Sequence, residues 1–185
     1  MSHGNICQLV VQSHVQTSVP PVPLSIAFSP VKGAGGGQDL LVQKLTEIGV
    51  TDIYPLLPTR RSIAKGSRFG NKAAAATPTN SHINLSRMVK ICREASMQSR
   101  RVFLPTIHPP VSVNAISKMA GVALADPSGS ALVSSDRFLV IGPEGGWDSE
   151  ELALFDRRVS LGDTVLRSET AGVVAAALMA ALQRS

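Results

Sequence analysis

The chain has 185 residues, enough for one well-packed core or for one core with a small appendage. Hydrophobic residues make up 44% of it, which excludes wholesale disorder. The formal net charge of +5 favours a polyanionic partner such as nucleic acid, although charge by itself does not prove one.

The compartment is indicated by the cysteines and by the hydrophobic runs. Only Cys7 and Cys92 occur, in unlike contexts, which fits a reducing environment without a disulfide framework or a thiolate metal site. The N-terminus lacks the pattern of a signal peptide. The longest apolar run, residues 171–182, is shorter than the roughly 20 residues of a membrane span. We therefore expect a cytoplasmic protein with no membrane partner.

The first half of the chain predicts alternating strands and helices. Residues 6–15 and 24–28 favour strands, and a glycine-rich loop containing Lys32 follows at 30–37. Asp39 can cap a helix that runs to Ile48 and stops at Gly49, and residues 50–57 favour the next strand. A strand, a helix and a strand in about 35 residues form a βαβ unit, so a mainly parallel sheet is expected.

Basic residues are concentrated in the next part of the chain. Residues 59–72 are rich in Arg and Lys, and residues 85–98 predict a helix whose buried stripe would be Leu85, Val89, Cys92 and Ala95. Its outer face and C-terminal end carry further arginines. This basic surface is either an ordinary solvated helix face or a phosphate-binding strip, and its continuity with residues 59–72 favours the strip.

The second half predicts the remaining elements of an α/β fold. Strands are expected at 102–107, 122–125, 138–141 and 159–161, and helices at 112–120, from 149 onward, and at 170–183. A turn is expected at 126–129.

The segment Gly142-Pro143-Glu144-Gly145-Gly146 follows a predicted buried strand. Glycines remove side chains where a ligand or a second backbone must approach closely. A tight strand-to-helix turn would use the same residues, so the segment alone leaves both interpretations open. It is neither a Walker loop nor a dinucleotide-binding fingerprint.

Arg167 and Glu169 stand just before the most apolar helix of the chain. Opposite charges in such a place are costly unless they are paired or used. One interpretation is a structural ion pair with Thr170 as helix cap, and the other is a functional pair. Residues 173–182 have almost no polar face, which predicts a helix buried on all sides, within the fold or against a second subunit.

Other catalytic arrangements are not indicated. The four histidines are scattered, and no Ser or Cys stands beside one in a recognisable nucleophile motif. No cluster has the spacing of metal ligands, so no metal is expected.

Two C-terminal motifs together carry a resemblance. They are Ile141-Gly142-Pro143-Glu144-Gly145-Gly146 and Leu161-Gly162-x-x-Val165-Leu166-Arg167-x-Glu169-Thr170-Ala171, with Glu150-Glu151 between them. The pair resembles the small-subunit (16S) ribosomal RNA uridine-N3 methyltransferase family of the SPOUT superfamily. Upstream matches are Lys32-Gly33, Lys44, Glu47-Ile48-Gly49-Val50, Pro55-Leu56, Arg61-Ser62 and Gln98-Ser99-x-Arg101 followed by Pro105.

The resemblance covers residues 24–183, with modest departures. Met97 stands where the family usually has an acidic residue, Ile48 where Leu is usual, and Ser168 where Thr is usual. The family fold is α/β, a mainly parallel sheet flanked by helices with a C-terminal trefoil knot. The implied cofactor is S-adenosyl-L-methionine. The resemblance implies that the cofactor is bound by Leu124, Ala125, Ile141, Gly142, Pro143, Glu144, Gly145, Gly146, Leu161, Gly162, Val165, Leu166, Thr170 and Ala171.

The reaction implied by the resemblance is methylation of N3 of a uridine in 16S rRNA. Its weakly acidic N3–H requires a base or a group that stabilises the uridine anion. Arg167 is expected to stabilise that charge, and Glu169 is expected to position the uridine or to remove its proton. Implied partners are 16S rRNA or the small ribosomal subunit and a second copy of the chain in a homodimer. The RNA-binding residues would be Lys32, Arg60, Arg61, Arg87, Lys90, Arg93 and Arg101.

The resemblance also implies a division of the chain. Residues 1–28 would be a remnant of an N-terminal PUA-like β-domain, too short to close a barrel, and residues 29–185 the knotted methyltransferase domain. A SPOUT methyltransferase acting on another RNA base, or a truncated non-catalytic RNA-binding module, are the alternatives.

Overall fold

The computed structural model describes residues 21–30, 36–58 and 83–184. The predicted strand at 6–15, most of the loop at 30–37 and the basic stretch at 59–72 lie outside the described residues. So do Lys32, Arg60 and Arg61, which the sequence nominates for RNA binding.

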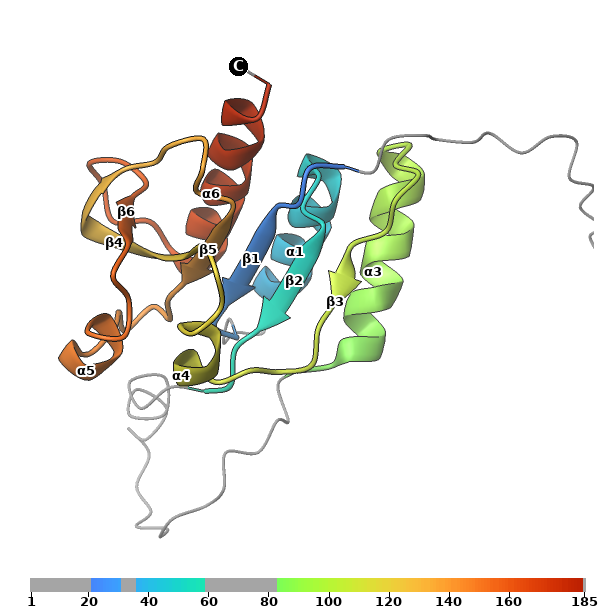
Figure 1. Ribbon diagram of the computed structural model, residues 1–185. Coiled ribbons are helices and arrows are strands. Elements are labelled where there is room, and N and C mark those ends of the chain that lie inside the picture. Colours follow the sequence, from blue (N-terminus) through green and yellow to red (C-terminus); the bar gives the residue numbers. More distant parts are fainter. Residues whose placement is uncertain (1–20, 31–35, 59–82, 185) are drawn as a thin grey trace, which may run out of the picture.

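A six-stranded, all-parallel sheet forms the centre of the described structure, as predicted. Its strands are β1 (Ser25–Phe28), β2 (Asp52–Pro55), β3 (Thr106–Ile107), β4 (Val122–Ala131), β5 (Phe138–Ile141) and β6 (Arg158–Ser160). Their order across the sheet is β3-β2-β1-β5-β4-β6 (Figure 1). Parallel strands place all their carboxyl ends at one edge, which is where such sheets bind ligands.

Strand β1 lies in the middle of this sheet. Ser25–Phe28 pairs with β2 on one side and with β5 on the other. Residues 25–28 therefore pair within the same sheet as the later strands. The division of the chain after residue 28, with a β-domain remnant before it, stays a prediction.

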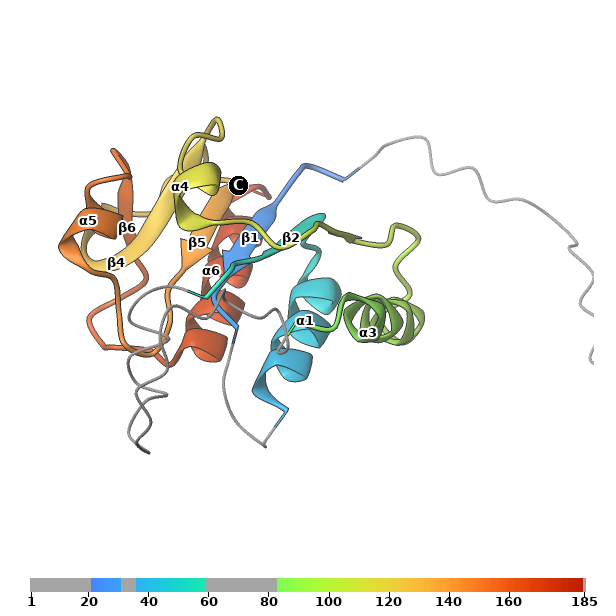
Figure 2. The same cartoon turned by 90° about the horizontal axis from the view of Figure 1, so that it is seen from below.

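Helices cover both faces of the sheet. They are α1 (Gly37–Ile48), α3 (Leu85–Gln98), α4 (Val113–Ile116), α5 (Ser149–Leu152) and α6 (Ser168–Leu182). Helices α1, α3 and α6 pack on one face around Ile26, Phe28 and Ile53, whereas α4 and α5 cover the other, around Ala27 and Val140 (Figure 2). No helix in the described ranges is long and apolar enough to cross a membrane.

The limits of two helices differ from the sequence-based expectation. Helix α1 begins two residues before Asp39, after Gly36 in a left-handed conformation, so Asp39 lies in the first turn and does not cap it. The predicted stop is confirmed, because Gly49 is left-handed and its N–H donates to the Leu45 carbonyl. Helix α6 begins at Ser168, with Arg167 at the cap position, so Thr170 is not the cap either.

The buried faces of α3 and α6 also differ in detail. In α3 the stripe includes Met88, Cys92 and Ala95, while Val89 is exposed, because burial follows the row of residues facing α1. Helix α6 buries Gly172, Ala175, Ala176, Met179 and Ala180 but leaves Leu178 39% exposed. Part of the apolar surface of α6, at Leu178, is thus not covered by the residues that the structure describes.

Strand β4 continues through residues 126–129, where the sequence predicts a turn, as one ten-residue strand with an irregularity. Both Ala125 and Ser130 lie opposite Val159 of β6, so residues 126–129 form an excursion from the β4–β6 pairing. Gly129 passes so close to β6 that an added Cβ would lie 2.4 Å from the Val159 nitrogen. This excursion brings Asp126 and Pro127 to the carboxyl edge of the sheet.

Candidate ligand pocket at the carboxyl ends of three strands

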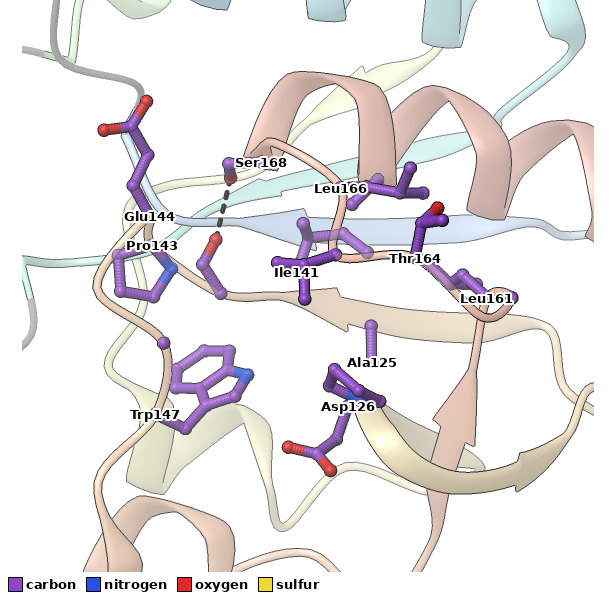
Figure 3. Close-up of a pocket in the computed structure, with 16 residues that line it drawn as sticks. Ala125, Asp126, Ile141, Pro143, Glu144, Trp147, Leu161, Thr164, Leu166 and Ser168 are labelled. Carbon is purple, nitrogen blue, oxygen red and sulfur yellow. Dashed lines mark hydrogen bonds between the residues drawn. The ribbon is translucent and has the colours of Figure 1, made fainter.

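A pocket lies where the segments after β5 and β6 meet the excursion in β4 (Figure 3). One wall is Ala125, Asp126 and Pro127, the second runs from Ile141 to Trp147, and the third from Leu161 to Leu166. Ser168 and Ala171, at the start of α6, complete the lining. Three segments that are distant in sequence thus meet because β5, β4 and β6 are neighbours in the sheet.

The glycine-rich wall is built around Trp147. The indole packs on Gly142, where an added Cβ would lie 2.7 Å from Cε2 of the ring. A turn follows, in which the Gly146 N–H donates to the Pro143 carbonyl over 2.8 Å and Gly146 has φ +71°. Gly142 therefore permits close packing of the indole, and Gly146 permits the left-handed turn. The tight-turn interpretation is confirmed, and the interpretation as a ligand-binding loop stays a prediction.

Ser168 connects this wall to helix α6. Its hydroxyl donates a 2.7 Å hydrogen bond to the Gly142 carbonyl, and the residue is buried (Figure 3). The beginning of α6 is therefore held against the glycine-rich loop. The sequence shows that residue 168 carries a hydroxyl group that can donate a hydrogen bond. Nothing local in the sequence identifies Gly142 as the acceptor.

The third wall is a short irregular segment after β6. Gly162 has φ +137°, and the Ser160 hydroxyl donates to the Gly162 carbonyl over 3.1 Å. Val165 lines the pocket although it is 87% exposed, so it stands at the rim. Its exposure is unusual for a branched apolar side chain and marks a surface that a bound molecule could cover.

The predicted cofactor-binding residues largely meet in this one pocket. All of them line it except Leu124, Gly145 and Thr170. Leu124 is fully buried in the core, and Thr170 is exposed on α6. Five lining residues were not named singly in the prediction: Asp126, Pro127, Trp147, Thr164 and Ser168. The resemblance places the cofactor against the loops 124–127 and 161–166, which contain three of them, whereas Trp147 and Ser168 lie outside the predicted loops.

Asp126 is held in a fixed orientation in the β4 wall. One carboxylate oxygen, Oδ1, accepts a 2.8 Å hydrogen bond from the Ser128 N–H and another from the Ser128 hydroxyl. The other acidic lining residue, Glu144, is exposed, and in Figure 3 its carboxylate points away from Trp147 and Asp126. The lining is otherwise mostly apolar and backbone.

Arg167 and Glu169 stand beside the pocket at the start of α6 but do not line it. Arg167 is exposed, and within the described residues it forms no ion pair with Glu169. Oε2 of Glu169 is buried and accepts no hydrogen bond in that same part of the chain. The interpretation as a structural ion pair is therefore wrong. An unpaired buried carboxylate oxygen costs free energy, as expected at a site kept for function.

The predicted RNA-binding residues are not equivalent. Arg87 forms an ion pair with Asp39, which raises the pKa of Arg87 and lowers that of Asp39. Lys90 is 3.9 Å from Glu94, and both side chains are exposed. Arg93 is exposed on α3. These side chains form a solvated face on which Arg93 and Lys90 are the most available cations.

Arg101 has a different position from the other arginines. Its guanidinium donates to the carbonyls of Thr46, Gly49 and Val50, at the C-terminal end of α1. Burial lowers its pKa. Cations stabilise helix C-termini because they complement the unpaired carbonyls. Arg101 therefore holds the end of α1, and its prediction as an RNA contact has little geometric support.

The arrangement can enclose a small, partly apolar molecule with a few polar groups. Apolar side chains can hold a flat ring, exposed backbone groups can pair with its edge, and Asp126 can accept from hydroxyl or ammonium groups. No group of His, Cys, Asp and Glu suited to a metal ion occurs among the residues that the structure describes.

Fold and pocket together define an α/β protein with a pocket at the carboxyl ends of parallel strands, the edge at which such sheets bind ligands. The RNA methyltransferase domain family model matches residues 18–180, and the chain belongs to that family. It is 31% identical over 204 aligned residues to ribosomal RNA small subunit methyltransferase E of Synechocystis, covering 100% of this chain and 61% of the relative.

Two further relatives show the same likeness. The protein of the same name from Rickettsia conorii is 27% identical, over 75% of this chain and 57% of the relative. The crystal structure of a ribosomal RNA small subunit methyltransferase E from Neisseria gonorrhoeae, bound to S-adenosyl methionine, superposes with a TM-score of 0.66 at 26% identity, over 90% of this chain and 70% of that one. The chain thus spans about three-fifths of the length of the curated relatives that it matches.

Proposed function

We propose that this chain is an S-adenosyl-L-methionine-dependent methyltransferase that methylates N3 of a uridine in 16S rRNA. The observation that carries the proposal is the meeting of three strand-end segments in one pocket of a chain from the RNA methyltransferase domain family. The relatives named for small-subunit ribosomal RNA support the choice of substrate.

The pocket residues suit the cofactor. Its adenine is flat and needs apolar walls, for which Ile141, Leu161 and Leu166 are available. The absence of a Cβ at Gly146 lets the backbone of the glycine-rich loop approach a ligand closely. When bound, this cofactor supplies an activated methyl group on a positively charged sulfur.

The residues at the start of α6 have the chemistry that N3 methylation needs. The uridine imide must lose its proton, and the negative charge that develops must be stabilised. Arg167 is exposed beside the pocket and can place its guanidinium next to that charge. Glu169 has a carboxylate oxygen without a partner among the described residues, and this carboxylate can position the uridine or accept its N3 proton.

Charge and uncovered surface support the partners. Arg93 and Lys90 would contact the rRNA backbone, in 16S rRNA or in the assembled small subunit, and this contact would weaken with salt. The uncovered part of the apolar surface of α6, at Leu178, would pack on a second copy in a homodimer. A cytoplasmic location follows from action on ribosomal RNA.

The proposal also includes the domain organisation of the chain. The residues from β1 onward would form the methyltransferase domain with a C-terminal trefoil knot, and residues 1–20 a remnant of a β-domain that grips RNA. Because the chain spans 61% of its Synechocystis relative, a module that binds RNA without catalysis is the competing function.

Two measurements test the proposal. Isothermal titration with S-adenosyl-L-methionine should show one site per chain, since the pocket lies within one protomer. Incubation with the labelled cofactor and small subunits from a strain lacking the modification should then place label on a uridine of 16S rRNA. Absence of cofactor binding would favour the non-catalytic module, and label on another base or RNA would favour a different methyltransferase specificity.

A further inference from the structure

The side chain of Asp126 is the one unassigned acidic group in the pocket, and it stands in the central wall. In the sheet, β4 lies between β5 and β6, so the excursion after Ala125 separates the glycine-rich wall from the Leu161–Leu166 wall. Figure 3 shows Asp126 next to Ala125, with its carboxylate on the Trp147 side and pointing away from Leu161 and Thr164.

The Asp126 carboxylate is held in one orientation, and only one of its two oxygens accepts hydrogen bonds within the described residues. Ser128 donates two hydrogen bonds to Oδ1, which fixes the side chain through a local turn. Oδ2 receives no hydrogen bond and faces no cation within the described residues. An oriented carboxylate with one open oxygen is suited to accept from a ligand, and it loses little entropy in doing so.

We propose that Asp126 binds the ribose hydroxyls of the adenosyl cofactor. This inference rests on the proposed function. The ribose is the middle part of the cofactor, between the adenine and the methionine moieties, and Asp126 is in the middle wall of the pocket. Carboxylates recognise ribose hydroxyls in other α/β folds for the same reason, because a carboxylate only accepts and a hydroxyl can donate.

The rival partner for Asp126 is the ammonium group of the methionine moiety, and the test separates the two. The ligands are S-adenosyl-L-methionine and 5′-methylthioadenosine, which keeps adenine and ribose but lacks the amino acid. Binding to the full chain is measured by isothermal titration for the wild type, Asp126→Asn, Asp126→Ala and the control Asp163→Asn. Asp163 is an exposed acidic residue in the third segment and does not line the pocket.

Both ligands should bind Asp126→Asn and Asp126→Ala about tenfold more weakly than the wild type, which corresponds to one lost hydrogen bond to a charged group. Asp163→Asn should bind both as the wild type does. A 2′-deoxy analogue of methylthioadenosine should lose affinity for the wild type but little further affinity for Asp126→Ala. Thermal unfolding of each variant verifies that the fold is retained.

Two outcomes would overturn the assignment while leaving the proposed function intact. Wild-type affinity in both Asp126 variants would show that the carboxylate makes no ligand contact. Weakened binding of S-adenosyl-L-methionine with unchanged binding of methylthioadenosine would place the ammonium, not the ribose, at Asp126. If the wild type bound neither ligand, the proposed function itself would be wrong, and this inference with it.

Discussion

The Ser168 hydroxyl donates a 2.7 Å hydrogen bond to the carbonyl of Gly142, 26 residues earlier in the chain. Ser168 is buried, and the bond joins the first residue of α6 to the first residue of the glycine-rich loop. Two of the segments that form the pocket are thus held together by one side chain.

Replacing Ser168 by Ala should therefore affect both stability and ligand binding. The partly buried Gly142 carbonyl would lose a partner, at a cost of about 1 kcal/mol in unfolding free energy. The pocket would also lose its fixed width, so cofactor affinity should fall. Urea denaturation and titration calorimetry measure the two effects. Ser149→Ala, an exposed change in α5, is the control, and equal behaviour of both variants would contradict this role.

Gly142→Ala should disturb the same wall from its other side. Its Cβ would lie 2.7 Å from the Trp147 ring, so the indole has to move. Trp147 is the only tryptophan of the chain, so intrinsic fluorescence reports this movement directly. We expect a shifted emission maximum and weaker cofactor binding. An unchanged spectrum would mean that the loop absorbs the methyl group without moving the ring.

Gly129→Ala should destabilise the fold where β4 approaches β6. The added Cβ would lie 2.4 Å from a backbone nitrogen, which cannot rotate away as a side chain could. We expect a loss of more than about 2 kcal/mol in unfolding free energy, the range for overpacking at a rigid contact. Chemical denaturation measures it, with Ser135→Ala on an exposed turn as control. A loss near that of the control would show that the strands can separate.

The ion pair between Asp136 and Arg157 should make stability depend on pH. Arg157 donates from Nε over 3.0 Å and from Nη2 over 2.7 Å, and the Val133 N–H adds a third bond to the carboxylate. Hydrogen bonding to Arg157 is the main reason why the pKa of Asp136 lies below its ordinary value. A lowered pKa adds stability above the unfolded-state pKa of about 4, and this stability disappears as the pH falls through the folded-state pKa.

Asp136→Asn should remove this dependence. At neutral pH we expect a loss of about 2 kcal/mol, because Asp136 is only 6% exposed while Arg157 is partly solvated. The difference from the wild type should shrink as the pH falls below about 4. Denaturation at several pH values tests this, with the exposed Asp156→Asn as control. A constant difference at all pH values would mean that the charge of Asp136 contributes nothing.

Two arginines of the predicted RNA strip should separate into different roles. Arg101→Gln should lower stability by about 2 kcal/mol, because the carbonyls at the end of α1 lose a charged donor. Arg93→Gln should leave stability unchanged but weaken RNA binding, and it should reduce the dependence of log K on log salt by about one. Equal effects of both changes on RNA affinity at equal stability would contradict the distinction.

Local patterns in the sequence predicted much of the secondary structure. The strand at 138–141 and the helix at 85–98 have the predicted limits, because a continuous apolar run and a 3.6-residue periodicity are local properties. The stop of α1 at Gly49 was predicted for the same reason. The helix starts were less well predicted, since Gly36 and Arg167 occupy cap positions without a side-chain cap.

The sequence by itself determined that the chain is an α/β protein with a parallel sheet and that two C-terminal motifs belong together. Only the tertiary structure decided which side chains these motifs bring into one pocket and what the charged residues contact. The roles of Asp126 and Ser168 and the contacts of Arg101 with the end of α1 were not predicted, because they depend on strand order and on helix packing across up to 55 residues. Such contacts arise from the three-dimensional path of the chain, which local spacing does not encode.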